Sequence, residues 1–109
     1  MLIKNKILGL IGLAARARKI SYGTDSVKLQ ISKNNVKLII ISEEASERTK
    51  KNFIDLSEKY KVQKILFGKI EELSKAIGKS NKAVIGIQEN GLASEIVKIY
   101  NGGDVAWVR

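Results

Sequence analysis

Three short runs of apolar, mostly β-branched residues punctuate the sequence, and they constrain its fold more than any other feature. They occupy residues 37–42, 63–67 and 82–88, and the first two are continuous enough to predict strands buried on both faces. The segments around them carry apolar residues every three or four positions, a spacing typical of amphipathic helices. This alternation predicts an α/β fold, a three-layer α/β/α sandwich in which helices cover both faces of the sheet.

The ends of the expected helices are marked by particular residues. Residues 24–26 (TDS) and Asn90 are of types that cap helix N-termini, and Gly78 stands where a glycine often follows a helix C-terminus. A short extended piece is expected at residues 19–22, before Gly23. Five helices are expected, at about residues 3–17, from the caps at 24–26 to 33, from 46 to 60, 69–77 and 91–101.

The chain has the organisation of one domain. It has 109 residues without a linker, a low-complexity tract or an internal repeat. We therefore expect a single domain over residues 1–109, with a core at about 3–101 and a short β-prone tail at 104–109. The apolar positions 3, 7, 10, 11 and 14 fall on one helical face, so the uncharged run 7–15 fits an amphipathic first helix better than a secretory signal. No stretch approaches the ~20 apolar residues that cross a bilayer. These features predict a cytoplasmic protein that does not bind membranes. We also expect a monomer, although the sequence does not fix the oligomeric state.

Missing residue types exclude much of catalytic and metal chemistry. The sequence has no cysteine and no histidine. Disulfides, thiolate nucleophiles, histidine-dependent triads and cysteine- or histidine-based zinc sites are therefore excluded. Carboxylates alone could still hold magnesium or calcium or form a hydrolase pair. The adjacent Glu43 and Glu44 lie in extended chain, however, where neighbouring side chains point to opposite faces. We expect no catalytic residues, no metal and no cofactor.

The charge of the chain favours an anionic partner. It carries 20 Lys and Arg against 11 Asp and Glu, a formal net charge of +9, and basic domains of this kind are typical binders of nucleic acid. Residues 1–35 hold seven basic residues and one acidic residue, so a net +6 lies in the first third. This excess surrounds a helix start at Gly23, where free N–H groups favour phosphate. The candidate contacts are Arg16, Arg18, Lys19 and Lys28.

Several motifs resemble one known family of RNA-binding ribosomal proteins. Residues 12–19 (GLAARARK) followed by Gly23 match its opening, and residues 37–41 (KLIII) and 43–46 (EEAS) match its centre. Over almost its whole length the chain resembles the kink-turn-binding superfamily of the large-subunit L-seven-Ae/L-thirty-e type, and within it the short bacterial YlxQ-like branch. The resemblance implies a small mixed sheet of about four strands between helices.

The resemblance also implies where RNA binds. Members of the family place the start of the second helix against tandem sheared G·A pairs of a kinked RNA, and the loop after the fourth helix against an extruded base. A kink opens the major groove, which A-form RNA otherwise keeps too narrow to read. Basic residues would contact phosphates and give affinity rather than sequence choice. The helix start corresponds to Gly23, Thr24, Asp25 and Ser26, the loop to Gly78, Lys79, Ser80, Asn81 and Lys82, and the phosphate contacts to Arg16, Arg18 and Lys19.

Three positions depart from the family pattern. Kink-turn binders typically carry Asn-Glu or Lys-Gln at the second and third positions after the glycine and a lysine at the sixth. This chain has Asp25, Ser26 and Leu29 there, and Lys28 comes one residue early, a rotation of about 100° on a helix. The sequence therefore predicts a non-enzymatic, ribosomal-protein-like binder of structured RNA. Two identities of that RNA are left open, a kink-turn RNA and ribosomal RNA. With ribosomal RNA, the chain would belong to a ribonucleoprotein of translation associated with the ribosome.

Two other functions stay open at this point. The same fold would serve a protein-interaction module that has lost kink-turn recognition, and a small enzyme that uses carboxylates is the least favoured alternative. Tyr22 and Trp107 are candidates for stacking on bases, although six aromatic residues are too few for an extended stacking platform.

Overall fold

Helices and strands alternate along the chain, as the sequence predicts. The computed structural model describes residues 2–102, so the β-prone tail predicted at 104–109, Trp107 included, lies outside the described residues. The first helix begins one residue earlier than expected, and the short extended piece is a strand. The elements are α1 (Leu2–Arg16), β1 (Ile20–Tyr22), α2 (Thr24–Ser32), β2 (Leu38–Ile41), α3 (Glu47–Tyr60), β3 (Gln63–Leu66), α4 (Ile70–Ala76), β4 (Val84–Ile87) and α5 (Asn90–Tyr100).

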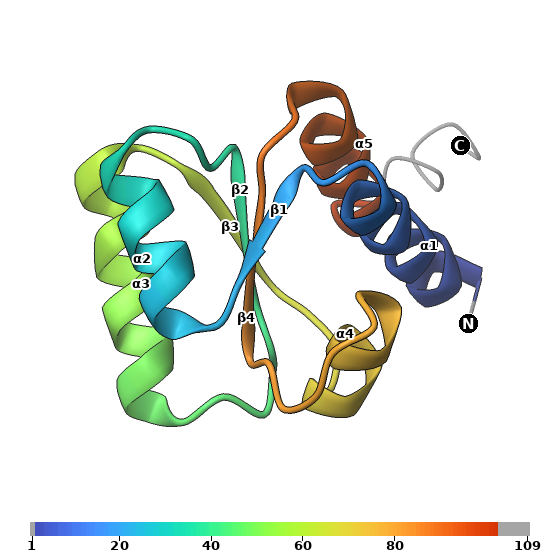
Figure 1. The fold of residues 1–109 in the computed structure, drawn as a ribbon, viewed down its shortest axis with the longest axis horizontal. Coiled ribbons are helices and arrows are strands. Elements are labelled where there is room, and N and C mark those ends of the chain that lie inside the picture. Colours follow the sequence, from blue (N-terminus) through green and yellow to red (C-terminus); the bar gives the residue numbers. More distant parts are fainter. Residues whose placement is uncertain (1, 103–109) are drawn as a thin grey trace.

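The four strands of the described chain form one mixed sheet in the order β1-β4-β2-β3 (Figure 1). β4 is antiparallel to both β1 and β2, whereas β2 and β3 are parallel. Ile40 of β2 lies opposite Ile65 on one side and Ile85 on the other. A small mixed sheet of about four strands is therefore confirmed.

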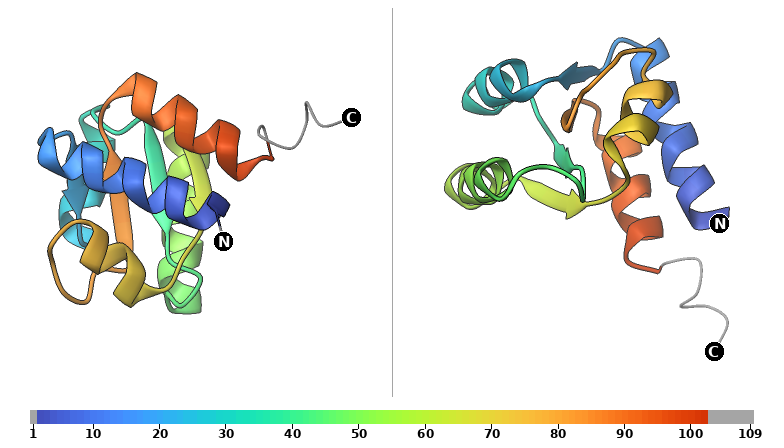
Figure 2. Two further views of the ribbon diagram at one scale, coloured as in Figure 1. Left: turned by 90° about the vertical axis from the view of Figure 1, so that its right-hand side faces the viewer. Right: turned by 90° about the horizontal axis from the view of Figure 1, so that it is seen from below.

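Helices cover both faces of this sheet. Figure 1 shows α2 and α3 on one side and α1, α4 and α5 on the other, and Figure 2 shows the same three layers from two further directions. Side chains of β2 alternate between the layers: Leu38 and Ile40 join the core under α1, α4 and α5, while Ile39 and Ile41 join the core under α2 and α3. All four are fully buried, each stabilising the fold by about 1.5–3 kcal/mol. The predicted three-layer α/β/α sandwich is confirmed.

The prediction that β3 is buried on both faces is wrong. Gln63 and Lys64 are exposed, Leu66 is half-buried and only Ile65 among the four is buried. The cause is the strand order, which places β3 at an edge where it pairs with β2 alone. Polar side chains at the start of an edge strand also protect it from pairing with other chains.

Two predicted helix caps are wrong as well. Gly23, not the TDS group after it, is the N-cap of α2, and its φ of 86° and ψ of 151° form a backbone conformation that favours glycine. Residues 24–26 make up the first helical turn instead. Asn90 is the first residue of α5, whose N-cap is Glu89, because the Glu89 carboxylate accepts a hydrogen bond from the Leu92 N–H at 2.6 Å.

None of the helices within residues 2–102 is both long and apolar enough to cross a membrane, and the first has 15 residues.

Candidate nucleic-acid interface

The structure places the start of α2 beside the loop that joins α4 to β4. The Gly23 N–H donates to the Val84 carbonyl at 3.0 Å, and Val84 begins β4 two residues after Lys82. Two segments more than fifty residues apart in the sequence therefore adjoin at one end of β1 and β4 (Figure 1). We call this region, residues 22–26 and 78–82, the seam.

The α2 side of the seam presents short polar groups to solvent. Thr24, Asp25 and Ser26 are all exposed in the first turn, where backbone N–H groups lack partners within the helix. The Gly23 carbonyl accepts from the Val27 N–H at 3.0 Å, which starts the helix. A Cβ at Gly23 would have open space around it, so the glycine is required by its positive φ rather than by crowding.

The loop side of the seam is held in shape by Ser74, a buried residue of α4. The Ser74 hydroxyl accepts from the Lys82 N–H at 2.8 Å and donates to the Lys82 carbonyl at 3.4 Å, and the Ser74 carbonyl accepts from the Lys79 N–H at 2.8 Å. Gly78, with a φ of 71°, directly follows the C-cap, so its predicted place is confirmed. Asn81 also has a positive φ, of 55°. The loop thus has a defined conformation with exposed polar side chains.

Tyr22 connects the two sides of the seam. Its half-buried ring lies at the end of β1, directly before Gly23. The ammonium groups of Lys79 and Lys82 lie 5.2 Å and 5.6 Å from the ring centroid, within the range of cation–π attraction. The sequence offers Tyr22 only as a candidate for base stacking, and its contact with the two lysines could not be predicted because it depends on how the loop packs against β1.

Lys19 lies at the opposite end of β1 from Gly23. The Lys19 carbonyl accepts from the Gln88 N–H at 2.8 Å, at the end of β4 far from Val84. The three residues of β1 lie between the two positions and place them about 13 Å apart. Backbone N–H groups of residues 92 and 91 lower the pKa of the neighbouring Glu89, and the charge of Lys19 adds a smaller lowering.

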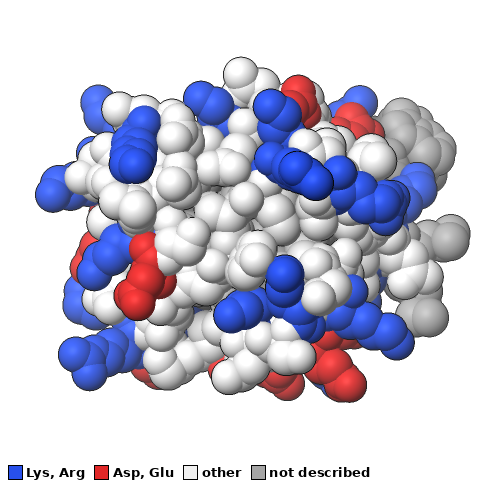
Figure 3. Space-filling view, in the orientation of Figure 1, with Lys and Arg blue, Asp and Glu red and all other residues white. Residues whose placement is uncertain are grey.

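The predicted basic cluster is therefore divided. Exposed Arg18, whose φ is 59°, turns the chain from α1 into β1 near Lys19. The Arg16 guanidinium instead folds back along α1, beside Gly12. A Cβ added at Gly12 would lie 3.6 Å from that guanidinium and 3.2 Å from the Ala76 carbonyl of α4. On the right-hand half of Figure 3, blue side chains lie over the turn between α1 and β1 and over the loop after α4, with uncharged surface between them, and further blue side chains lie over α2 and α3 on the left.

Lys28 lies on the α3 side of the helix start, away from the 78–82 loop. With Thr24 and Asp25 it lines a hollow of about 190 Å³ whose far side is formed by residues of α3, Arg48 among them. This placement agrees with the rotation expected for a lysine one position early on the helix. Arg48 is a second cation at this hollow that sequence reasoning did not find, because only the packing of α2 on α3 brings it there.

A larger hollow borders the loop on its α4 side. Its volume is about 730 Å³, and it is wide enough for a ligand of nucleotide size. It is lined by Glu44, Ile70, Glu71, Ser74, Lys75, Gly78, Lys79, Ser80 and Asn81.

Two carboxylates at or near this hollow, those of Glu44 and Glu72, are engaged in structural contacts. The Glu44 carboxylate accepts from the Ile70 N–H at 2.9 Å at the start of α4. The Lys69 N–H, followed by the Lys4 ammonium, lowers the pKa of Glu72 by hydrogen bonding to its carboxylate. Within residues 2–102, acidic side chains do not gather in a group that could hold a metal ion.

Known proteins share both the sequence pattern and the fold. A family model for the ribosomal protein L7Ae/L30e/S12e/Gadd45 family matches residues 5–97. The chain belongs to this family. It is 34% identical over 95 residues to the RNA-binding protein YlxQ of Bacillus subtilis (strain 168), with 84% of this chain and 92% of that protein covered. It is also 34% identical over 99 residues to the RNA-binding protein YlxQ of Enterococcus faecium, with coverages of 91% and 95%. The resemblance seen in the sequence, to the family and to its YlxQ-like branch, is confirmed.

Solved structures share the fold. A Bacillus halodurans C protein described as of unknown function superposes with a TM-score of 0.85 at 33% identity, covering 88% of this chain and 97% of that one. The Giardia lamblia 15.5kD RNA binding protein superposes with a TM-score of 0.77 at 19% identity, with coverages of 94% and 88%, and supports the fold alone. Family membership also confirms the prediction that the chain is not an enzyme.

Proposed function

We propose that the chain binds structured RNA through the seam. The observation that carries the proposal is the meeting of the α2 start with the 78–82 loop, fixed by the hydrogen bond from Gly23 to Val84 and by two lysines on Tyr22. The net charge of +9 and the two relatives named RNA-binding proteins support the same partner.

The geometry of the seam suits a kinked RNA better than a regular duplex. A regular A-form major groove is too narrow for side chains, whereas a kink exposes base edges that a helix start can approach. Residues 24–26 offer short hydroxyl and carboxylate groups, and the first-turn N–H groups add donors. Because Gly23 has no side chain, the RNA backbone can approach the helix start closely.

The second surface of the proposed site is the hollow beside the loop. Its volume of about 730 Å³ is sufficient for one extruded base, and Asn81 and Ser80 bring hydrogen-bonding side chains to its edge. Lys79 supplies a positive charge for the adjoining phosphate. The loop therefore contacts unpaired nucleotides while the helix start contacts the paired bases.

The choice of RNA follows from the departures at the helix start. Leu29 stands where kink-turn binders carry a lysine and is 52% exposed, so it offers an apolar surface there in place of a charge. Asp25 adds a negative charge beside the phosphates. We accordingly propose a structured RNA such as ribosomal RNA, bound by a monomer in the cytoplasm, with kink-turn preference as the property to be tested.

The proposal is tested by fluorescence anisotropy with two labelled RNAs of equal length, one with an internal loop that carries tandem G·A pairs and one fully paired. We expect binding that weakens steeply with salt, because phosphate contacts release counterions, and tighter binding of the kinked RNA. Equal affinity for both RNAs would remove the kink preference and leave RNA binding intact. No binding of either RNA at low salt would overturn the proposal.

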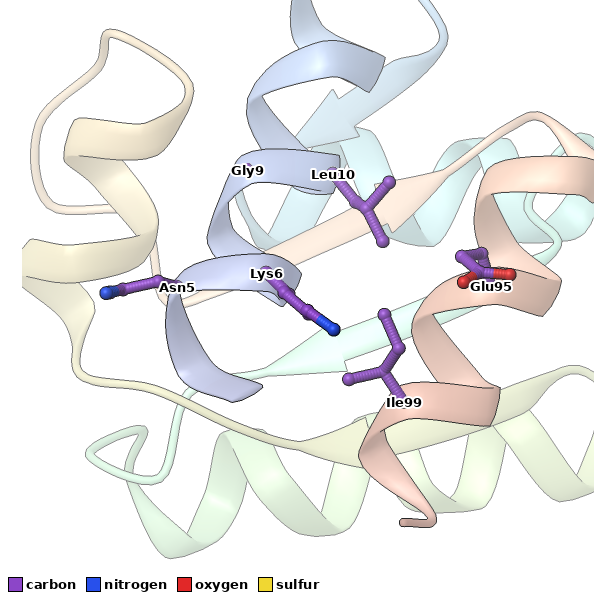
Figure 4. Close-up of a pocket in the computed structure, with 6 residues that line it drawn as sticks. All are labelled: Asn5, Lys6, Gly9, Leu10, Glu95 and Ile99. Atoms are coloured by element: carbon purple, nitrogen blue, oxygen red, sulfur yellow. The ribbon is translucent and has the colours of Figure 1, made fainter. Parts of the chain in front are cut away.

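A groove between α1 and α5 favours the second candidate, a protein-interaction module. Its volume is about 340 Å³. Figure 4 shows Leu10 and Lys6 of α1 and Ile99 and Glu95 of α5 around the same space, with Asn5 pointing away from it. Capture from lysate with and without ribonuclease separates the two candidates. Partners that survive ribonuclease treatment, together with absence of captured RNA, would favour the protein-interaction module.

A further inference from the structure

Tyr22 carries two lysine ammonium groups over its ring, which packing in the core alone does not require. Its side chain packs against the core beneath α1, α4 and α5 and is half-buried at the end of the edge strand β1. Two flexible ammonium groups, on Lys79 and Lys82, lie over that ring at 5.2 Å and 5.6 Å. Both lysines come from the loop of the seam, so one ring is the meeting point of both sides.

The two contacts can be exchanged for stronger ones when RNA binds. An exposed cation–π contact is weaker than the stacking of a base on an aromatic ring, which tolerates any base because every base has a π-face. An ammonium that leaves the ring gains a charge-assisted hydrogen bond to a phosphate. RNA provides both partners together, since each unpaired base is flanked by phosphates.

We propose that Tyr22 stacks on an unpaired base of the bound RNA, and that Lys79 and Lys82 move from its ring to the phosphates on either side of that base. This inference rests on the proposed RNA-binding function and adds a residue to it. In the free protein the two cation–π contacts hold the lysines near their later positions. The bound RNA then has one stacked base between two phosphate contacts.

A structural role for Tyr22 makes a different prediction from a stacking role. Stacking is not electrostatic, so removing the ring should lower RNA affinity without changing the dependence of affinity on salt. Removing a lysine that contacts phosphate should lower both, because one fewer counterion is released. A tyrosine that merely packs would affect stability and leave RNA affinity alone.

The chain offers a matched control in Tyr60. It is also half-buried and also carries an ammonium, that of Lys59, 5.4 Å from its ring centroid, but it lies at the end of α3, away from the seam. Tyr60→Leu thus removes a ring and a cation–π contact of the same kind elsewhere. Tyr22→Phe removes only the hydroxyl and keeps the ring.

The experiment measures anisotropy of the kinked RNA across a salt series for the wild type and for Tyr22→Leu, Tyr22→Phe, Tyr60→Leu and Lys79→Ala. We expect Tyr22→Leu to weaken binding by about 5- to 150-fold with an unchanged salt slope, and Tyr22→Phe and Tyr60→Leu to bind like the wild type. Lys79→Ala should reduce the slope by about 0.7–0.9. Circular dichroism and thermal melting verify that every variant is folded.

A second measurement reports stacking directly. With 2-aminopurine at the unpaired position of the kinked RNA, the wild type should change the fluorescence of that base and Tyr22→Leu should not. If the wild type binds the RNA and Tyr22→Leu shows the same affinity and the same fluorescence change, the stacking role is overturned and the proposed function stays in place. A loss of salt slope in Tyr22→Leu as large as that in Lys79→Ala would also overturn it. Absence of RNA binding by the wild type would overturn the proposed function itself.

Discussion

Ser74 holds the 78–82 loop of the proposed RNA surface in its conformation, and Ser74→Ala measures how much this contributes to stability and RNA binding. The side chain is 3% exposed in α4, and its hydroxyl is joined to both backbone groups of Lys82, through an acceptor contact of 2.8 Å and a donor contact of 3.4 Å. The substitution removes one oxygen and no charge. It therefore loosens the loop that carries Lys79 and Lys82 while leaving the electrostatics of the surface unchanged.

The expected magnitude follows from these two contacts. The 3.4 Å contact is long and adds little, so the loss is close to that of one neutral hydrogen bond, about 1 kcal/mol. Lys82 is half-buried, so water can partly replace the lost partner and keep the cost near this value rather than above it. A change of this size lowers Tm by roughly 5 °C in a chain of this length. If the loop must be closed to bind RNA, affinity falls by up to about fivefold.

The control is Ser94→Ala, because Ser94 is exposed on α5, outside the seam and outside the hollow beside the loop. Urea denaturation gives the free energy of unfolding, hydrogen exchange gives the opening of the Lys82 amide, and anisotropy gives RNA affinity. We expect Ser74→Ala to exchange the Lys82 amide faster and to bind RNA more weakly than the wild type, with the same salt slope. The control should match the wild type in all three measurements. Lys82 exchange as slow in Ser74→Ala as in Ser94→Ala would refute the argument that Ser74 holds the loop.

Three further predictions test the packing, the charges and the pH dependence. Gly86→Ala should lower the free energy of unfolding by about 1–3 kcal/mol in urea denaturation, because its Cβ would lie 2.7 Å from the buried Ser21 hydroxyl oxygen. Adding Ser21→Ala to this variant should restore part of the loss, and no restoration would contradict the assignment of the clash to Ser21. In RNA-binding anisotropy at low salt, Lys28→Ala should weaken binding less than Lys79→Ala, because Lys28 faces the hollow toward α3, and the reverse order would place RNA on that side. The folded-state pKa of Glu89 is lowered from its ordinary 4.5, so its contribution to stability is present above pH 4.5 and is lost as pH falls through the folded value. Denaturation midpoints of Glu89→Gln should therefore depend less on pH below 4.5 than those of the wild type, and identical pH profiles would refute the cap.

The layered fold was predictable because it follows from strong local patterns. The run of three isoleucines after Leu38 has no polar position, and a strand without one must be covered on both faces. The run that became β3 begins with Gln63 and Lys64, and its place at the sheet edge depends on strand order, which no local pattern fixes. The Gly23 cap was missed because polar residues directly after it are equally typical of caps.

The candidate site was predictable in parts and not as a whole. The glycine-led helix start and the loop after α4 were both visible in the sequence, since each carries a turn signal and charge. Their adjacency depends on the pairing of β1 with β4, and so does the position of Tyr22 under two lysines. Proximity in sequence was also misleading, because Lys19 is close to Gly23 along the chain and lies at the other end of the strand.

The central claim, that RNA binds at the seam, is tested most directly by mapping amide chemical shifts in ¹H–¹⁵N spectra while the kinked RNA is added. The account predicts that the shifts that change most belong to residues 22–26 and 78–82, with little change along the groove between α1 and α5 at Gly9 and Ile99. Changes concentrated at that groove, with the seam unaffected, would contradict the account.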